Sequence, residues 1–202
     1  MSGRKLTHNE IAIAKKVFKD SLDYQKIRIH NEKYAFFQPN NSGMTPNGEI
    51  YVHGAYRKDY SSAVPQLKAF FIHEMVHVWQ YQLKILNPVT AAIGESIRHV
   101  FSYEKAYEYT LEAGKDILDY KIEQQASIIE DYYRVTHAGL PVHLNRMKNN
   151  YSDVKKDKLF EKVLAKFITS PKYALHTIEC KRSRHGKPGT RKIVCNRVPV
   201  NG

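Results

Sequence analysis

The sequence of 202 residues has few cysteines and no long apolar run. Its two cysteines, Cys180 and Cys195, form no C-x-x-C pair, which argues against a structural zinc knuckle. No segment approaches the ~20 apolar residues of a membrane span. The first residues also lack the apolar core of a secretory signal. These absences predict a chain that is made in the cytoplasm with no transmembrane segment and no signal peptide.

Acidic residues are scarce in the C-terminal third. Residues 136–202 contain 15 Lys or Arg but 4 Asp or Glu, whereas residues 1–135 contain 17 and 16, so the net charge of +12 lies mostly in the last third. We therefore expect a domain over residues 1–140 and a basic helix and tail over residues 141–202 that packs on it or extends from it. The basic region favours an acidic partner, such as an anionic protein, a membrane, a nucleic acid or a cell-wall polymer. The alternative is a solvated face that aids solubility.

The two cysteines of the tail leave its redox state open. Cys180 and Cys195 can close a disulfide in an oxidising compartment, with a stabilisation of about 3 kcal/mol for a loop of this size. In a reducing cytosol they are two free thiols.

The central motif is His-Glu-x-x-His at residues 73–77. Positions i and i+4 lie on one face of a helix, so His73 and His77 can direct two imidazole nitrogens at one Zn²⁺ ion. Glu74 projects about 100° away, where it can serve as a general base without being a ligand. This is the arrangement of a zinc hydrolase.

A structural interpretation competes with the metal site. Two core histidines can bond to backbone atoms while Glu74 pairs with a lysine. However, the surrounding helix is apolar nearly all round, and two imidazoles and a carboxylate are costly to bury unless something satisfies them. A bound metal would do so, and we therefore favour zinc.

The hydrophobic patterns predict an α+β fold that is mainly helical. Helices are expected over residues 8–22, 65–86, 121–133 and 153–168, and strands over 26–30 and 49–54. Thr7 and Glu10 form a capping box, Ser61 and Ser62 can cap the second helix, and Pro65 suits its first turn. Residues 107–111 fit a strand or a helix, residues 88–102 fit a connection, and the chain from residue 171 lacks periodicity.

The strand expected at residues 49–54 stands just before the His-Glu-x-x-His helix. In zincin proteases an edge strand in this position pairs with an extended substrate. The alternative is an ordinary strand of a small sheet, and His53 is expected to be an incidental histidine.

A catalytic zinc takes three protein ligands and keeps a fourth position open. Gln80 and Leu83 occupy the places where the metzincin extension needs Gly and His, so that class is excluded. Gluzincins use a later glutamate, and Glu123, in the first turn of a strong helix, is the preferred candidate, with Glu130 as a ligand or an outer partner. The other candidates are Glu95, Glu104, Glu108, Glu112, His99, His137 and His143.

The sequence resembles one family over roughly residues 5–135. The resemblance rests on the segment from His73 to Gln80, on Tyr107-x-Tyr109 with Gly114-Lys115-Asp116, and on residues 122–126 with 130–132. These resemble the metallopeptidase effector domain at the C-terminus of some VgrG spike proteins, and related Rhs-type toxin ends, of bacterial type VI secretion systems.

The resemblance implies a compact gluzincin-like fold with zinc held by His73, His77 and Glu123, and with Glu74 as catalytic base. It also implies a peptide or protein substrate, a spike carrier, a cognate immunity protein, and delivery into a target cell with toxicity in the periplasm. The chain starts at Met1 without an attached spike, which suits an excised domain or a separately loaded effector, and the basic tail has no counterpart in the family pattern.

Two other functions remain open at this point. The first is a non-enzymatic, zinc-stabilised module that contacts an acidic protein or nucleic acid through its basic third. The second is an amidase that acts on cell-wall peptides. An oxyanion-stabilising donor is expected in a hydrolase, but the sequence does not choose among 14 tyrosines; Tyr132 and Tyr133 are merely near Glu123 on the expected helix.

Overall fold

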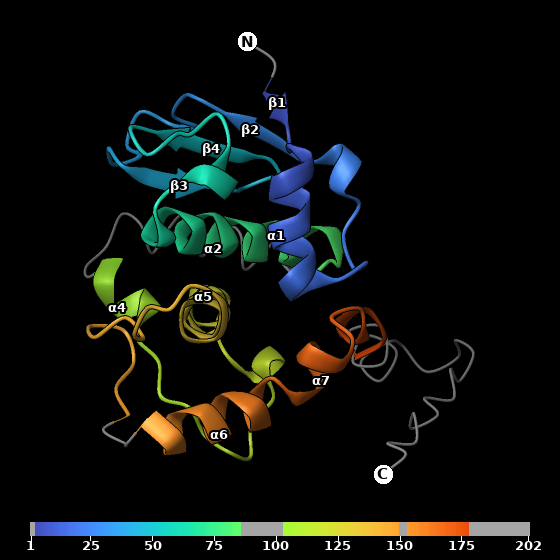
Figure 1. The fold of residues 1–202 in the computed structure, drawn as a ribbon, viewed down its shortest axis with the longest axis vertical. Coiled ribbons are helices and arrows are strands. Elements are labelled where there is room, and N and C mark those ends of the chain that lie inside the picture. Colours follow the sequence, from blue (N-terminus) through green and yellow to red (C-terminus); the bar gives the residue numbers. More distant parts are fainter. Residues whose placement is uncertain (1–2, 86–102, 150–152, 178–202) are drawn as a thin grey trace, which may run out of the picture.

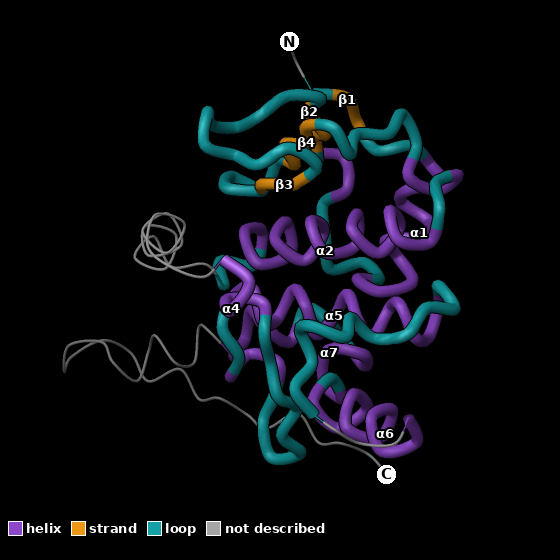
Figure 2. The backbone as a smooth tube through the Cα atoms, turned by 90° about the vertical axis from the view of Figure 1, so that its left-hand side faces the viewer, coloured by secondary structure: helices purple, strands orange, loops and turns teal. Residues whose placement is uncertain are grey.

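The structure is a computed structural model that describes residues 3–85, 103–149 and 153–177. Its elements lie in layers, with a small sheet above α2, α5 on the other side of α2, and α6 beyond α5, while α7 lies to the side of α5 (Figure 1). Figure 2 shows the same order of layers from the side. The described elements are β1 (Arg4–Lys5), α1 (His8–Phe18), β2 (Arg28–His30), β3 (Ser42–Met44), β4 (Ile50–His53), α2 (Pro65–Gln82), α4 (Tyr103–Tyr107), α5 (Ile122–His137), α6 (Asp153–Val163) and α7 (Ala165–Thr169), with short 3-10 helices at Tyr24–Lys26, Tyr60–Ser62 and Ile117–Asp119. The predicted α+β class is confirmed.

The described strands form one four-stranded sheet in the order β1-β2-β4-β3. β2 pairs with β4 in parallel, while β1 and β3 pair antiparallel with β2 and β4. The strand expected at residues 49–54 is β4 (Ile50–His53), which lies in the interior of the sheet. The alternative of an ordinary strand in a small sheet is therefore confirmed, and the prediction of an edge strand is wrong. The edge strand next to β4 is β3, a three-residue strand inside a segment whose Asn, Ser and Gly residues are typical of a turn.

Two of the three predictions about the starts of α1 and α2 are confirmed. Thr7 caps α1, and its hydroxyl and the Glu10 carboxylate make the reciprocal bonds of a capping box. Pro65 occupies the first turn of α2, as expected, but the cap is Val64, so the prediction that Ser61 or Ser62 caps this helix is wrong. Both serines lie in the preceding 3-10 helix.

Three helix ends differ from the expected ones. α1 ends at Phe18 because Lys19 takes a positive φ of 48°, and α2 ends at Gln82. The helix expected over residues 153–168 is broken at Leu164 into α6 and α7. The expected connection over 88–102 lies wholly outside the described residues, and so do Cys180 and Cys195.

Residues 107–111, which fitted a strand or a helix, contain the end of a helix followed by a β-bridge. α4 ends at Tyr107, and Tyr109 then forms an isolated parallel β-bridge with Met147. The chain from residue 171 was expected to be irregular, but residues 173–177 are helical. The remainder of that segment lies outside the described residues.

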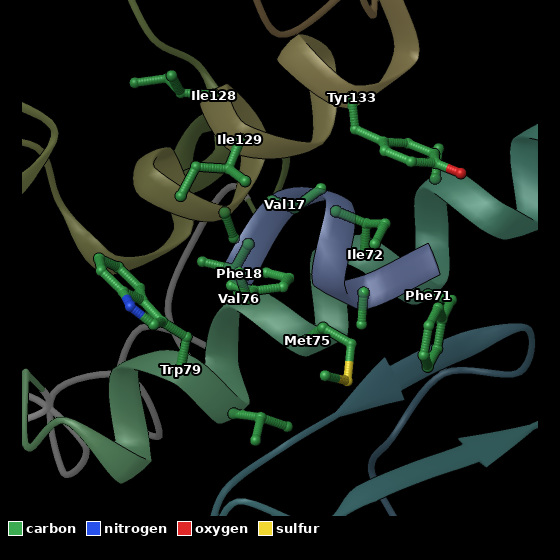
Figure 3. Close-up of a cluster of buried hydrophobic side chains, with 14 of the residues drawn as sticks. Val17, Phe18, Phe71, Ile72, Met75, Val76, Trp79, Ile128, Ile129 and Tyr133 are labelled. Atoms are coloured by element: carbon green, nitrogen blue, oxygen red, sulfur yellow. The ribbon is translucent and has the colours of Figure 1, made fainter. Parts of the chain in front are cut away.

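The hydrophobic core centres on α2 and joins α1, α5 and α7 to it. Trp79, Phe71, Met75 and Val76 of α2 lie among Phe18 of α1 and Ile129 of α5 (Figure 3). Phe167 of α7 makes edge contacts with the rings of Phe18 and Trp79, at 6.1 and 5.2 Å between centroids. The Trp79 indole also donates a hydrogen bond to the Pro171 carbonyl. α2 is thus held from several sides, which fixes the direction of its polar face.

Residues on both sides of residue 140 share this core. Val142, Met147, Phe160 and Leu164 are buried in the same hydrophobic cluster as the side chains of α2. The part of the chain from 141 to 149 therefore packs directly against α5. In the described ranges, no helix combines the length and the apolar character that crossing a bilayer requires.

Candidate metal centre

His73 and His77 lie one turn apart on α2, and their rings are 5.0 Å apart between centroids. α2 packs mainly on α5, and Glu123 stands in the first turn of α5. The Glu123 Oε2 atom lies 3.7 Å from His73 Nε2 and 3.3 Å from His77 Nε2. The structure therefore brings together the three residues that the sequence assigned as ligands, with one donor atom of each lying within 4.8 Å of the others.

These separations suit a shared cation better than direct hydrogen bonds. Protein N–H···O bonds are about 2.7–3.2 Å long, shorter than both distances. In a tetrahedral site with bonds of about 2.0–2.1 Å, neighbouring donor atoms are about 3.4 Å apart. Glu123 Oε2 is also buried, and no described group forms a hydrogen bond to it. A buried carboxylate oxygen without a partner is costly, and a metal ion would satisfy it.

The outer nitrogen of each imidazole is occupied. His73 Nδ1 lies 3.0 Å from Glu130 Oε2, and His77 Nδ1 lies 2.8 Å from Gln80 Oε1. An oxygen can only accept here, so we assign the proton of each ring to Nδ1. In the neutral form of each ring, Nε2 then presents a lone pair to the point where Glu123 converges, which is the tautomer that a metal requires.

The Gln80 amide connects the two helices of the site. Its Nε2 donates to the Ile122 carbonyl and to Gln125 Oε1, each at 3.0 Å. The Gln125 amide in turn donates to the Tyr120 carbonyl at 2.8 Å. Because the Gln80 nitrogen has two acceptors, its oxygen must face His77. Ile122, the residue before Glu123, is thereby hydrogen-bonded to α2, the helix that carries both histidines.

Glu130 is held from a second direction by Arg146. The Arg146 guanidinium donates to Glu130 Oε2 at 2.5 Å and lies 5.1 Å from the centroid of the Tyr107 ring. The Tyr107 ring lies 5.7 Å from that of His73. Glu130 is thus an outer partner of His73 in this structure, and Tyr107 is the tyrosine beside the site. Tyr132 and Tyr133 instead contact His137 and core rings.

The electric field of the site favours a positive charge. Burial alone would lower the pKa of His73, but Glu123 and Glu130 outweigh it and raise the pKa to about 10. Burial would raise the pKa of both carboxyls, but the imidazoles hold the pKa of Glu123 well below its usual range, and His73 with Arg146 lowers that of Glu130 to about 2. Two anionic carboxylates beside two imidazoles form an environment that suits a dication.

Glu74 is buried between α2 and β3, with an exposed fraction of 4%. The Thr45 hydroxyl donates to Glu74 Oε2 at 2.7 Å. A Cβ atom added to Gly43 would lie 2.3 Å from Glu74 Oε1 and from its Cδ. Sequence reasoning missed Gly43 and Thr45, because Thr45 is 29 residues from Glu74 and both lie in a turn-like stretch.

The other candidate ligands lie elsewhere or outside the description. Glu108 pairs with Lys148, Glu112 pairs with Lys115, and the His137 ring stacks on Tyr133. The His143 backbone nitrogen donates to Asp131. Glu95 and His99 are outside the described residues, as is the side chain of Glu104.

No family model matches the sequence. Over 170 residues, 83% of the chain, it is 36% identical to the type VI secretion system spike protein VgrG2b of Pseudomonas aeruginosa, and it spans 15% of that protein's length. The solved effector domain of VgrG2b matches with a TM-score of 0.61 and 32% identity, covering 81% of this chain and 82% of that one.

The chain belongs to the VgrG2b effector-domain family. Its fold and most of its length are shared with that domain, so the resemblance predicted from the sequence is confirmed at this level. Membership in the VgrG2b effector-domain family does not by itself assign a metal or a reaction to the residues around His73.

Proposed function

We propose that this chain is a zinc-dependent metallopeptidase. The observation that carries the proposal is the convergence of His73 Nε2, His77 Nε2 and Glu123 Oε2, with Glu74 buried beside them. These described residues supply three protein donors, which is the number of a catalytic zinc site, whereas a structural site is closed by four. Bound zinc polarises the scissile carbonyl and lowers the pKa of water to about 7.

The chain's own residues divide the remaining work. His73, His77 and Glu123 hold the ion, while Glu130 and Gln80 orient the imidazoles. Glu74 takes a proton from the attacking water and passes it to the leaving amine. The free edge of β3 suits an extended peptide, which would pair with it and lie along the site. This set of roles defines a hydrolase of peptide bonds.

We further propose a role as a toxin delivered by a type VI secretion system. The support is membership in the VgrG2b effector-domain family, since VgrG2b is a spike protein of such a system. Because the chain spans 15% of VgrG2b, the spike that carries it, the target compartment and an immunity protein are parts of the proposal. We place the toxic action in the periplasm of the target cell.

One experiment separates the enzymatic proposal from a binding role. The zinc-loaded chain and its Glu74→Gln variant are incubated with a bacterial proteome-derived peptide library, and new termini are identified by mass spectrometry. We expect cleavage by the wild type, loss of cleavage in Glu74→Gln, and one bound zinc in both. A surface variant, Glu112→Gln, should behave as the wild type. Equal cleavage by Glu74→Gln would remove Glu74 as the base.

The same proteins report on the substrate class and the compartment. Purified peptidoglycan stem peptides added to the assay distinguish a peptidase from a cell-wall amidase. Expression in Escherichia coli with or without an added secretion signal tests the periplasm: we expect growth arrest only with the signal and only with Glu74 intact. Arrest that is independent of Glu74 would contradict the proposed mechanism.

A further inference from the structure

Gly43 of β3 and Thr45, which directly follows this strand, both lie against the carboxylate of Glu74. Gly43 and Thr45 are two positions apart, so they point to the same side of an extended chain. Thr45 Oγ1 donates to Glu74 Oε2 at 2.7 Å, and Thr45 is itself buried with an exposed fraction of 6%. Among the residues that the structure describes, Thr45 is the one donor that reaches this carboxylate.

The glycine at position 43 is explained by space and not by backbone conformation. Gly43 pairs with Val52 in the regular antiparallel register of β3 and β4, and its φ is not positive. Any residue can adopt that backbone. Yet a Cβ atom would meet the carboxyl carbon and Oε1 of Glu74 at 2.3 Å, far inside van der Waals contact. The missing side chain is the room that the carboxylate occupies.

We propose that Gly43 and Thr45 form a cradle that sets the orientation of the catalytic base, with Thr45 as its positioning residue. This inference rests on the proposed peptidase function. A carboxylate that is free to rotate about its side-chain torsions spends only part of its time in a reactive geometry, and small misplacements are costly in rate. One hydrogen bond on Oε2 and one close backbone surface at Oε1 remove this freedom.

The cradle also links base positioning to substrate binding. Among the described strands, β3 pairs with β4 alone, and its other edge suits an extended peptide. A peptide that pairs there lies on the strand that contains Gly43 and that runs directly into Thr45. The distance between the bound peptide and the base is therefore set by one short segment.

The test compares variants of the cradle with a control variant of a surface hydroxyl outside the site. Thr45→Val removes the donor and keeps the shape, Thr45→Ser restores the donor, and Gly43→Ala fills the space. Ser62→Ala is the control, because its exposed hydroxyl bonds to the Asp59 carbonyl in the 3-10 helix before α2. The probe is the peptide that the wild type cleaves fastest in the library, and kcat is expressed per bound zinc.

We expect Thr45→Val to lower kcat about tenfold to a hundredfold, which is the effect of losing a hydrogen bond to a charged group. KM and zinc affinity should stay within about twofold of the wild type, because no ligand and no β3 edge group is lost. Thr45→Ser should recover most of kcat, and Gly43→Ala should lose at least as much as Thr45→Val. Ser62→Ala should match the wild type.

The outcomes separate this inference from the function beneath it. If Thr45→Val and Gly43→Ala cleave like the wild type while Glu74→Gln does not, the cradle is wrong and the peptidase stands. If the loss appears in KM, or if Thr45→Ser fails to recover kcat, Thr45 does not position the base. If Thr45→Val does not fold, the comparison of Gly43→Ala with Ser62→Ala decides in the same way. If the wild type cleaves no peptide, the proposed function and the cradle both fall.

Discussion

Gln80→Met is the change that tests the outer support of the metal centre most sharply. Methionine keeps the length and volume of the side chain but removes the amide. The His77 Nδ1–H and Gln125 Oε1 then lose the partner that Gln80 gives them, and the Ile122 carbonyl loses one donor. Gln80 is fully buried, so water does not replace these bonds.

The magnitude follows from the groups left unpaired. Each buried polar group without a partner costs about 1–3 kcal/mol, so two such groups should lower the free energy of unfolding by about 3 kcal/mol. A chain of about 200 residues loses about 2–4 °C in Tm per kcal/mol. We therefore expect the Tm of the metal-free variant to fall by about 6–12 °C.

The same change should weaken zinc binding. Without an acceptor at Nδ1, the proton of His77 is no longer favoured on that nitrogen, and Nε2 is less often free for the metal. Loss of such an outer partner typically costs 10- to 100-fold in metal affinity. Zinc competition titrations measure this directly, and thermal melts of the metal-free protein measure the stability.

Gln82→Met is the matched control for this prediction. Gln82 is on the same helix and exchanges two hydrogen bonds with the backbone of Asp23, but at the surface. Its loss should change stability by less than about 1 kcal/mol and leave zinc affinity unchanged. A Gln80→Met protein that melts and binds zinc like the wild type would refute the argument.

Three further predictions concern stability. Free zinc at about a thousand times its dissociation constant stabilises the folded protein by about 4 kcal/mol. Its removal by a chelator should therefore lower Tm by about 8–16 °C, and an unchanged Tm in calorimetry would contradict a zinc site. Arg146→Met should lower the free energy of unfolding by about 1–3 kcal/mol at pH 7, because Glu130 loses a charged donor. The pKa of Glu130 is about 2 in the folded protein and about 4.5 in the unfolded one. The stabilisation by Arg146 is therefore complete above pH 4.5 and fades as pH falls towards 2. If urea titrations show that Arg146→Met lowers the free energy of unfolding by the same amount at every pH, this explanation is wrong. Burial raises the pKa of Asp131 to about 6 from 3.8, so ionisation of this carboxyl costs stability. Relative to Asp131→Asn, the wild type should lose free energy of unfolding as pH rises from about 4 to 6. Parallel curves of the free energy of unfolding against pH for the two proteins would show that Asp131 does not titrate there.

The sequence predicted the central part of the site because that part depends on local rules. The i, i+4 spacing of His73 and His77 on an apolar helix needs no knowledge of the rest of the fold. Glu123 was preferred over Glu130 because it opens a strong helix, and the structure places it nearest both Nε2 atoms. The helices at residues 8–18, 65–82, 122–137 and 153–163 were also located, apart from their ends, but the break at Leu164 and the helix at residues 173–177 were not.

The remaining features depend on contacts between distant segments. Gln80 served to exclude the metzincin pattern and as part of the segment that carries the resemblance, but its connection to α5 requires the packing of two helices. Arg146 reaches Glu130 because the Tyr109–Met147 bridge fixes its segment, a pairing of residues 38 apart. The edge strand was misplaced because Ser42-Gly43-Met44 has the composition of a turn and pairs only through β4.

The central claim is that one dication binds where α2 and α5 meet. A crystal structure of the zinc-loaded protein, with anomalous data collected at the zinc edge, tests it most directly. We predict a single strong peak within about 2.0–2.2 Å of His73 Nε2, His77 Nε2 and Glu123 Oε2, with no fourth protein ligand. The absence of a peak there, or a fourth protein side chain closing the site, would contradict the account.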